Sequence, residues 1–152
     1  MTEGAMTSDA ITKSITINAR PSRIWAVLTT PDLITRWMSD EPLTITSDWH
    51  AGAPILMRGT LHGYAFENRG IIQIFDADKT FQYAFWSTLS ASRLADLPEN
   101  YTTVRFDLTP QPETTLLTVT LSDFAEPSIA PHANLYWGGT LPIIKALCEG
   151  SD

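Results

Sequence analysis

Two pairs of side chains in the sequence have the types and spacing that acid–base chemistry needs. Asp48 and His50 are two residues apart, so on a strand they would share one face as a base and its orienting carboxylate. His62 and Glu67 flank a predicted hairpin turn at Gly63-Tyr64, so they would face one another across that hairpin. The simpler interpretation is polar residues near a turn and a solvated cross-strand pair. We therefore assign no catalytic residue and keep Asp48, His62 and Glu67 as candidates only.

A third pair could hold an anionic ligand. Arg58 and Arg69 fall on the two strands of the same predicted hairpin. An arginine that faces inward would bind a ligand carboxylate through two parallel hydrogen bonds. Because neighbouring like charges repel, we favour the interpretation in which both arginines point to solvent.

The sequence predicts neither a metal nor a cofactor. Its three histidines, His50, His62 and His132, fall on separate elements and lack the i, i+4 spacing of a helical zinc motif. No G-x-S-x-G elbow, Walker loop or G-x-G-x-x-G occurs, so serine-esterase, P-loop and dinucleotide hypotheses lack their signatures. The single cysteine, Cys148, excludes an intrachain disulfide, and we interpret it as a small buried hydrophobe rather than a nucleophile.

Composition excludes several classes of protein. The 152 residues fit one domain, and 43% apolar with 18% charged residues is typical of a globular chain. Seventeen acidic residues against ten basic ones give a net charge of −7, which argues against nucleic acid and anionic membranes as partners. No apolar run approaches the length of a membrane helix, and residues 1–10 are polar. We expect a cytoplasmic protein with a flexible N-terminal tail over residues 1–10 and a single domain over residues 11–150.

Hydrophobic periodicity predicts the elements that must position these side chains. Pro21 and Pro31 suit the first position of two short helices, whose apolar faces carry Ile24 to Leu28 and Leu33 to Trp37. Period-two alternation predicts seven strands, which are Ile11–Ala19, Leu43–Trp49, Ile55–His62, Ala65–Phe75, Thr80–Thr88, Tyr101–Thr109 and Thr114–Ser122.

The stretch from Pro131 to Cys148 predicts one long helix that is interrupted. Its apolar stripe consists of Ala133, Trp137, Leu141, Ile144 and Cys148. Gly138-Gly139 and Pro142 work against a regular helix, because proline cannot donate a backbone hydrogen bond and its ring crowds the preceding turn. We predict a kink there, with Trp137 facing the interior. The competing prediction is two helices, with Thr140 capping the second.

The order of elements favours an α+β domain. One strand, two short helices, six consecutive strands and a long C-terminal helix suit an antiparallel seven-stranded sheet. Such a sheet needs one face covered, and only the C-terminal helix is large enough. We predict a curved sheet wrapped around that helix.

This order, together with specific sequence stretches, resembles the helix-grip fold of the START-like (SRPBCC) superfamily, also seen in Bet v-like proteins. The branch it resembles is named after the activator of the heat-shock protein 90 ATPase. The resemblance covers about Ile11 to Leu147. Its residues are PSRIWAVLTTPDLITRW (21–37), Gly52, Gly70, Phe81 to Trp86, PENYTTVRFDL (98–108), TLLTVTL (115–121) and Trp137-Gly138.

The resemblance implies an apolar cavity between the sheet and the C-terminal helix, and a small hydrophobic or aromatic ligand within it. No cofactor is implied. Two alternatives stay open: an enzyme on an aromatic or polyketide-like substrate, and a chaperone-ATPase activator with a role in stress response. A chaperone or a second copy of the chain is then a candidate partner. The implied ligand-binding residues are Trp37, Trp49, Phe66, Phe85, Trp86, Phe106, Trp137 and Leu141.

Overall fold

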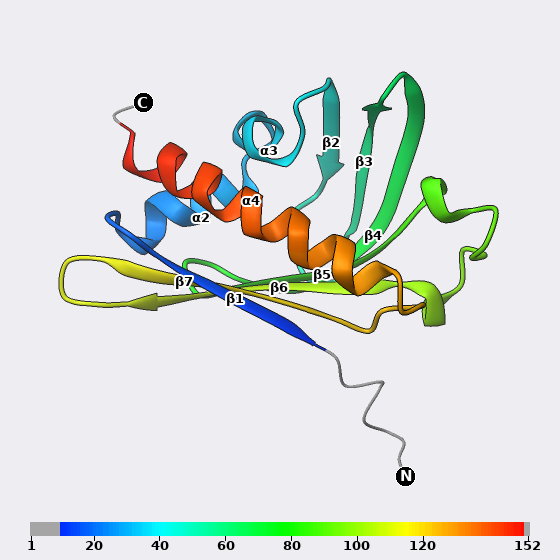
Figure 1. Ribbon diagram of the computed structural model, residues 1–152. Helices are drawn as coiled ribbons and strands as arrows, with labels where there is room; N and C mark the ends of the chain where they lie inside the picture. The colour runs from blue at the N-terminus through cyan, green and yellow to red at the C-terminus, as the bar shows by residue number, and fades with distance from the viewer. Residues whose placement is uncertain (1–9, 151–152) are drawn as a thin grey trace, which may run out of the picture.

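Seven antiparallel strands form one curved sheet in the order β1-β7-β6-β5-β4-β3-β2 in the computed structural model, which describes residues 10–150 (Figure 1). The predicted tail, residues 1–10, lies outside the described residues apart from Ala10. All seven predicted strands are present. Their bounds are β1 Ile11–Ile17, β2 Leu43–Ser47, β3 Pro54–Leu61, β4 Tyr64–Asp76, β5 Thr80–Ser87, β6 Thr102–Pro110 and β7 Thr115–Ser122.

Two short α-helices connect β1 to β2, which lie at opposite edges of the sheet. α2 (Pro21–Thr29) and α3 (Pro31–Met38) each begin at a proline, as predicted, because a first helical residue needs no N–H donor. Thr30 occupies the N-cap position of α3, although its side chain makes no capping hydrogen bond. Two short 3₁₀-helices, η1 (Thr88–Ser90) and η2 (Pro98–Asn100), lie in the segment that connects β5 to β6.

The hairpin between β3 and β4 turns one residue earlier than predicted. Leu61 pairs with Tyr64, so the turn consists of His62 and Gly63 rather than Gly63-Tyr64. Both turn residues have positive φ, 52° and 84°, which is the backbone of the two-residue turn that matches strand twist. This register decides which side chains oppose one another along β3 and β4.

The C-terminal helix α4 (Ile129–Glu149) is continuous for 21 residues and lies across the concave face of the sheet (Figure 1). The two-helix prediction is therefore wrong, while the kink stays a prediction. Pro142 is tolerated inside the helix because Gly138, whose carbonyl loses its partner, lies on the exposed side, where water can bind it. The predicted apolar stripe is confirmed, with Trp137, Leu141, Ile144 and Cys148 buried.

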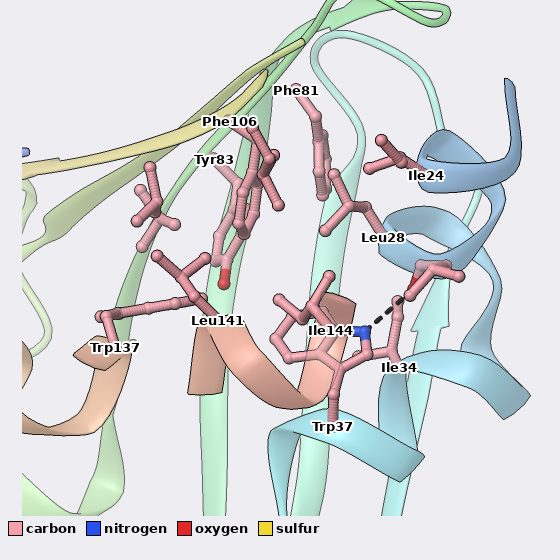
Figure 2. Packing of buried hydrophobic residues seen from close by; sticks show 14 of the residues in the cluster. Ile24, Leu28, Ile34, Trp37, Phe81, Tyr83, Phe106, Trp137, Leu141 and Ile144 are labelled. Atoms are coloured by element: carbon pink, nitrogen blue, oxygen red, sulfur yellow. Dashed lines mark hydrogen bonds between the residues drawn. The ribbon is translucent and has the colours of Figure 1, made fainter. Parts of the chain in front are cut away.

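The hydrophobic core fills the space between the inner face of the sheet and the three helices α2, α3 and α4 (Figure 2). Ile24 and Leu28 reach it from α2, and Ile34 reaches it from α3. Phe81 and Phe106 meet them from the sheet, with ring centroids 6.1 Å apart. The core therefore fixes the helices over the strands that carry the candidate site.

Candidate ligand site

An aromatic ladder runs along the inner face of β5. Phe81, Tyr83 and Phe85 alternate on that face, with successive ring centroids 5.4 and 6.0 Å apart. Phe81 and Tyr83 are buried, whereas Phe85 is only half-buried. Phe81 and Tyr83 are therefore packed into the core, whereas part of Phe85 is exposed to solvent.

β4 places a polar group beside the Phe85 end of this ladder. Phe66 and Asn68 share the inner face, since Asn68 opposes the buried Met57 of β3 and Ser87 of β5. The Oδ1 atom of Asn68 is buried and has no hydrogen-bond partner among the described residues. A buried acceptor without a partner is rare in native proteins and calls for a donor, either water or a ligand.

A second polar group, the hydroxyl of Tyr83, belongs to the same interior. Tyr83 points toward α4, and its hydroxyl oxygen lies near Leu141 (Figure 2). Burial raises the pKa of Tyr83, and the nearby Tyr136 adds to the rise. Tyr83 therefore stays neutral and can donate or accept a hydrogen bond.

Sequence reasoning missed Asn68 and Tyr83. A polar residue in phase with inward-facing Phe66, two positions away on the same strand, is the signal that identifies Asn68. Tyr83 lies between Phe81 and the predicted ligand-binding residue Phe85 in the period-two alternation of the same strand, and that position identifies it as inward-facing.

Four of the predicted ligand-binding residues are core residues. Trp37, Phe106, Trp137 and Leu141 are buried. The rings of Trp37 and Trp137 lie 6.0 Å apart, and those of Phe106 and Trp137 lie 5.5 Å apart (Figure 2). These side chains pack against one another, so they can form only the closed end of a ligand site. Phe66 and Phe85 are half-buried and lie on the inner face of β4 and β5.

Trp86 faces the opposite side of the sheet, so its placement in an inner cavity is wrong. It pairs with Arg69, whose guanidinium carbon lies 5.5 Å from the Trp86 ring centroid. Its Nε1 donates a hydrogen bond to the carbonyl of Leu94 at 3.0 Å, so the segment after β5 covers it. The reason is the strand period of two, because Phe85 and Trp86 are neighbours and cannot face the same side.

Trp49 lies at the packed end of the interior. Its ring centroid is 6.3 Å from that of Phe75 and 6.2 Å from that of Phe81. Its backbone has a φ of 55°, and it follows the end of β2 at Ser47. Trp49 therefore sits at the opposite end of the ladder from Phe85.

The predicted pairing of His62 with Glu67 is wrong. Glu67 opposes Arg58 on β3, four residues before the start of the turn at His62. The Glu67 carboxylate binds Nε of Arg58 at 3.0 Å and Nε of Arg69 at 2.5 Å. Hydrogen bonds from Arg69 and Arg58 lower the pKa of Glu67, so it is a poor general base at neutral pH. The solvent-facing interpretation of both arginines is confirmed.

The other catalytic candidates do not converge with Glu67. His62 is exposed, and its backbone N–H donates to Oε2 of Glu41 at 2.9 Å. Asp48 and His50 are exposed and lie beyond the end of β2, so the predicted shared strand face does not exist. Within residues 10–150, no group of three or more His, Cys, Asp or Glu side chains is arranged to hold a metal ion.

No helix in the described part of the chain is long and apolar enough to cross a membrane.

Comparison with solved structures returns the same helix-grip architecture, with a curved sheet around α4 and two short helices after β1. No curated protein matches the chain.

Solved structures from three bacteria share this fold. ChR145 from Cytophaga hutchinsonii is 28% identical, with a TM-score of 0.77 over 92% of this chain and 93% of that one. The Aha1 dimer from Colwellia psychrerythraea is 23% identical, with a TM-score of 0.71 over 94% and 98%. CalU16 from Micromonospora echinospora is 16% identical, with a TM-score of 0.67 over 94% and 76%. The family model "Activator of Hsp90 ATPase homolog 1-like protein" matches residues 18–149, and the chain therefore belongs to that family of START-like domains.

Proposed function

We propose that the protein binds a small hydrophobic or aromatic molecule on its inner sheet face, at the end that carries Phe66 and Phe85. Phe66 and Phe85 supply the apolar contact, and Tyr83 closes the inner end of the site. The unpartnered Oδ1 atom of Asn68 carries the proposal, because it is an acceptor that a ligand donor would satisfy. The ligand is therefore an apolar molecule with one N–H or O–H group.

Energetics favour this combination. Leaving a buried acceptor unsatisfied costs about 1–3 kcal/mol, which a ligand hydroxyl or amine would recover. Flat aromatic side chains with a few polar groups are typical of small-molecule sites. Phe66 and Phe85 are half-buried in the free protein, so a ligand would remove further apolar surface from water.

Two probes with the same ring system test the proposal, one with a hydroxyl donor and one in which a methyl ether replaces it. 2-Naphthol carries a hydroxyl donor, and 2-methoxynaphthalene has the same ring system without it. Each is titrated into ¹⁵N-labelled protein, and amide shifts are followed at Phe66, Asn68 and Phe85. We expect 2-naphthol to bind about tenfold more tightly, since a hydrogen bond to a buried group is worth about 1–1.5 kcal/mol.

Asn68→Leu removes the acceptor, and Asn134→Leu makes the same change at an exposed position of α4. Asn68→Leu should abolish the difference between the two probes, while Asn134→Leu preserves it. Equal affinity of both probes for the unmodified protein, or shifts away from the inner face, would contradict the proposal.

Family membership supports a second candidate, an interaction module that activates a chaperone ATPase, and with it the predicted role in stress response. A pull-down with an Hsp90-type chaperone and an ATPase assay test it. Stimulation that survives Asn68→Leu would separate this activity from ligand binding. The enzyme alternative is not carried further, because Asp48, His62 and Glu67 lie apart.

A homodimer is proposed on the strength of the Colwellia Aha1 structure, which was solved as a dimer. Light scattering on the purified full chain measures the mass directly. A mass near 17 kDa at all concentrations tested would contradict dimerisation, since one chain weighs 16.8 kDa. The predicted cytoplasmic location stays a prediction.

A further inference from the structure

A hollow lies on the outer face of the sheet, on the side opposite to α4. It is a groove of about 960 Å³, and its floor includes Ile71, Ala84 and Thr103. These three residues pair across β4, β5 and β6. They alternate with inward-facing neighbours such as Ile72, so their side chains point away from the core.

Two connecting segments form the walls of this groove. Residues 96–101 come from the segment between β5 and β6, and residues 123–127 connect β7 to α4. Both segments lie at the same end of the sheet (Figure 1). They stand over Ile71, which is 43% exposed although it lies in the middle of a central strand.

The walls combine apolar and acidic side chains. Tyr101 and Phe124 contribute rings to the lining. The four charged side chains of the lining are all carboxylates, with no lysine or arginine among them: Asp96, Glu99, Asp123 and Glu126.

Two of these carboxylates already have cationic partners. Asp96 binds Arg69, and Glu126 binds Arg93. Asp123 accepts a hydrogen bond from the hydroxyl of the neutral Thr103 at 2.6 Å, so its charge is not compensated. The side chain of Glu99 makes no hydrogen bond or ion pair with another residue of the 10–150 range. The groove therefore presents an uncompensated negative charge beside an apolar floor.

We propose that this outer groove binds a small organic cation with an apolar body, separately from the inner ligand site. The apolar part would cover Ile71 and contact Phe124, while the cationic group lies near Glu99 and Asp123. An aromatic ring beside a carboxylate also favours a cation. The volume lies in the range of small-molecule sites.

The sheet itself argues against an extended peptide as the occupant. β4, β5 and β6 each pair with a strand on both sides, so the floor has no free backbone edge to which a peptide strand could add. Recognition must come from side chains and loops. A compact cation satisfies this condition.

Three probes with one ring system and three charges test the assignment. 1-Naphthylmethylamine is cationic at pH 7, 1-naphthalenemethanol is neutral, and 1-naphthoic acid is anionic. Each is titrated into the ¹⁵N-labelled full chain, following the amides of Ile71, Ala84 and Thr103. We expect the amine to bind most tightly and the acid not to bind. The affinity of the amine should fall as salt is added, because exposed charges are screened.

Glu99→Gln removes the unpaired carboxylate, and Glu113→Gln makes the same change at an exposed turn between β6 and β7. Glu99→Gln should weaken the amine about two- to fivefold, as expected for one exposed ion pair, and Glu113→Gln should not. Ile71→Thr should weaken all probes that bind, whereas Ile143→Thr on the exposed side of α4 should not. Unchanged thermal unfolding shows that the variants remain folded.

Equal binding of amine and alcohol, shifts confined to Phe66 and Phe85, or no binding of the amine would each overturn the proposal. Binding of a Lys-Phe-Lys peptide where the amine fails would assign the groove to a peptide instead. Asn68→Leu should leave the amine's affinity unchanged when it is read from the groove amides of Ile71, Ala84 and Thr103, so the two proposals fail independently.

Discussion

The indole Nε1 of Trp37 donates a hydrogen bond to the backbone carbonyl of Val27 at 2.9 Å (Figure 2). In a continuing helix, that carbonyl would accept from the N–H four residues later, at position 31. Position 31 is a proline and has no N–H, so the side chain of α3 supplies the donor that the backbone of α2 lacks. The same proline that starts α3 thus creates the need for Trp37.

Replacing Trp37 with Phe should destabilise the protein. The change leaves the Val27 carbonyl buried without a donor, which costs about 1–3 kcal/mol in free energy of unfolding. Trp25→Phe is the matched control, because Trp25 is half-buried and its indole nitrogen makes no hydrogen bond within residues 10–150. Urea unfolding measures both, and equal losses would argue against a special role for the Trp37–Val27 bond.

Two glycine-to-alanine changes should alter the free energy of unfolding in opposite directions, although both add a methyl group in open space. Among residues 10–150, and leaving aside the chain neighbours and the local backbone of the helix, no atom lies within 4 Å of the added atom at Gly139 or Gly63. Gly139 is inside α4, so Gly139→Ala should stabilise by about 0.5–1 kcal/mol. Gly63 has φ of 84° in the β3–β4 turn, so Gly63→Ala should destabilise by about 1 kcal/mol. Thermal unfolding of both variants tests this, and a shared sign would contradict it.

Cys148 should resist thiol reagents in the folded protein. It is 3% exposed, and burial raises the pKa of its thiol to about 12 from 9.0, so almost no thiolate is present at pH 8. Labelling with a coloured disulfide reagent should be slow in buffer and fast in 8 M urea. Fast labelling of the native protein would show that the α4 end opens.

The same thiol predicts a dependence of stability on alkaline pH. Above pH 9 the unfolded chain releases a proton that the folded chain retains, so the free energy of unfolding falls by up to about 1.4 kcal/mol per pH unit. The loss should run from pH 9 to about pH 12. Cys148→Val removes this contribution, and the difference between the two proteins isolates it from other groups. If the free energy of unfolding of the two proteins fell equally with pH, the assignment to Cys148 would be contradicted.

Glu149 should contribute stability that is lost in acid. Its carboxylate accepts a hydrogen bond from the N–H of Asn18 at 2.7 Å and also binds Lys145, and both interactions lower its pKa. Because the pKa of Glu149 is lower in the folded state, this group stabilises the fold fully above its unfolded pKa of 4.5. That stabilisation is lost as the pH falls through the folded pKa. Glu149→Gln should therefore weaken the dependence of the free energy of unfolding on pH below pH 4.5, as measured by urea unfolding at several acidic pH values.

The elements of the fold follow from local sequence signals, but the placement of side chains does not. Pro21 and Pro31 mark both short helices, and alternation marks every strand. The pairing of Glu67 with Arg58 depends on a turn that begins one residue earlier than predicted, and a one-residue shift changes every opposing pair. That Trp86 faces outward was already implied by its neighbour Phe85, since adjacent strand residues face opposite sides.

The continuity of α4 and the position of the groove could not be read from local sequence. Pro142 is accommodated because Gly138 lies on the exposed side, and exposure depends on how the whole helix packs. The outer groove joins Ile71, Glu99 and Phe124, which are far apart in the sequence. Neither periodicity nor spacing predicts that two connecting segments meet at one end of a sheet.

The position of β1 sets an order of events during synthesis. Within residues 10–150, β1 pairs only with β7, and the hydroxyls of Ser14 and Thr118, 104 positions apart in sequence, form a hydrogen bond. Strands β2 to β6 each pair with the next strand in the sequence, so these pairs can form as the chain leaves the ribosome. β1 can pair only once β7 has been made. Until Thr115–Ser122 emerges, Ile11–Ile17 is an unpaired strand segment with Ile11, Ile15 and Ile17 on one side. The sheet can therefore close only after β7 has been synthesised, and until then the unpaired β1 segment can pair with other chains and aggregate.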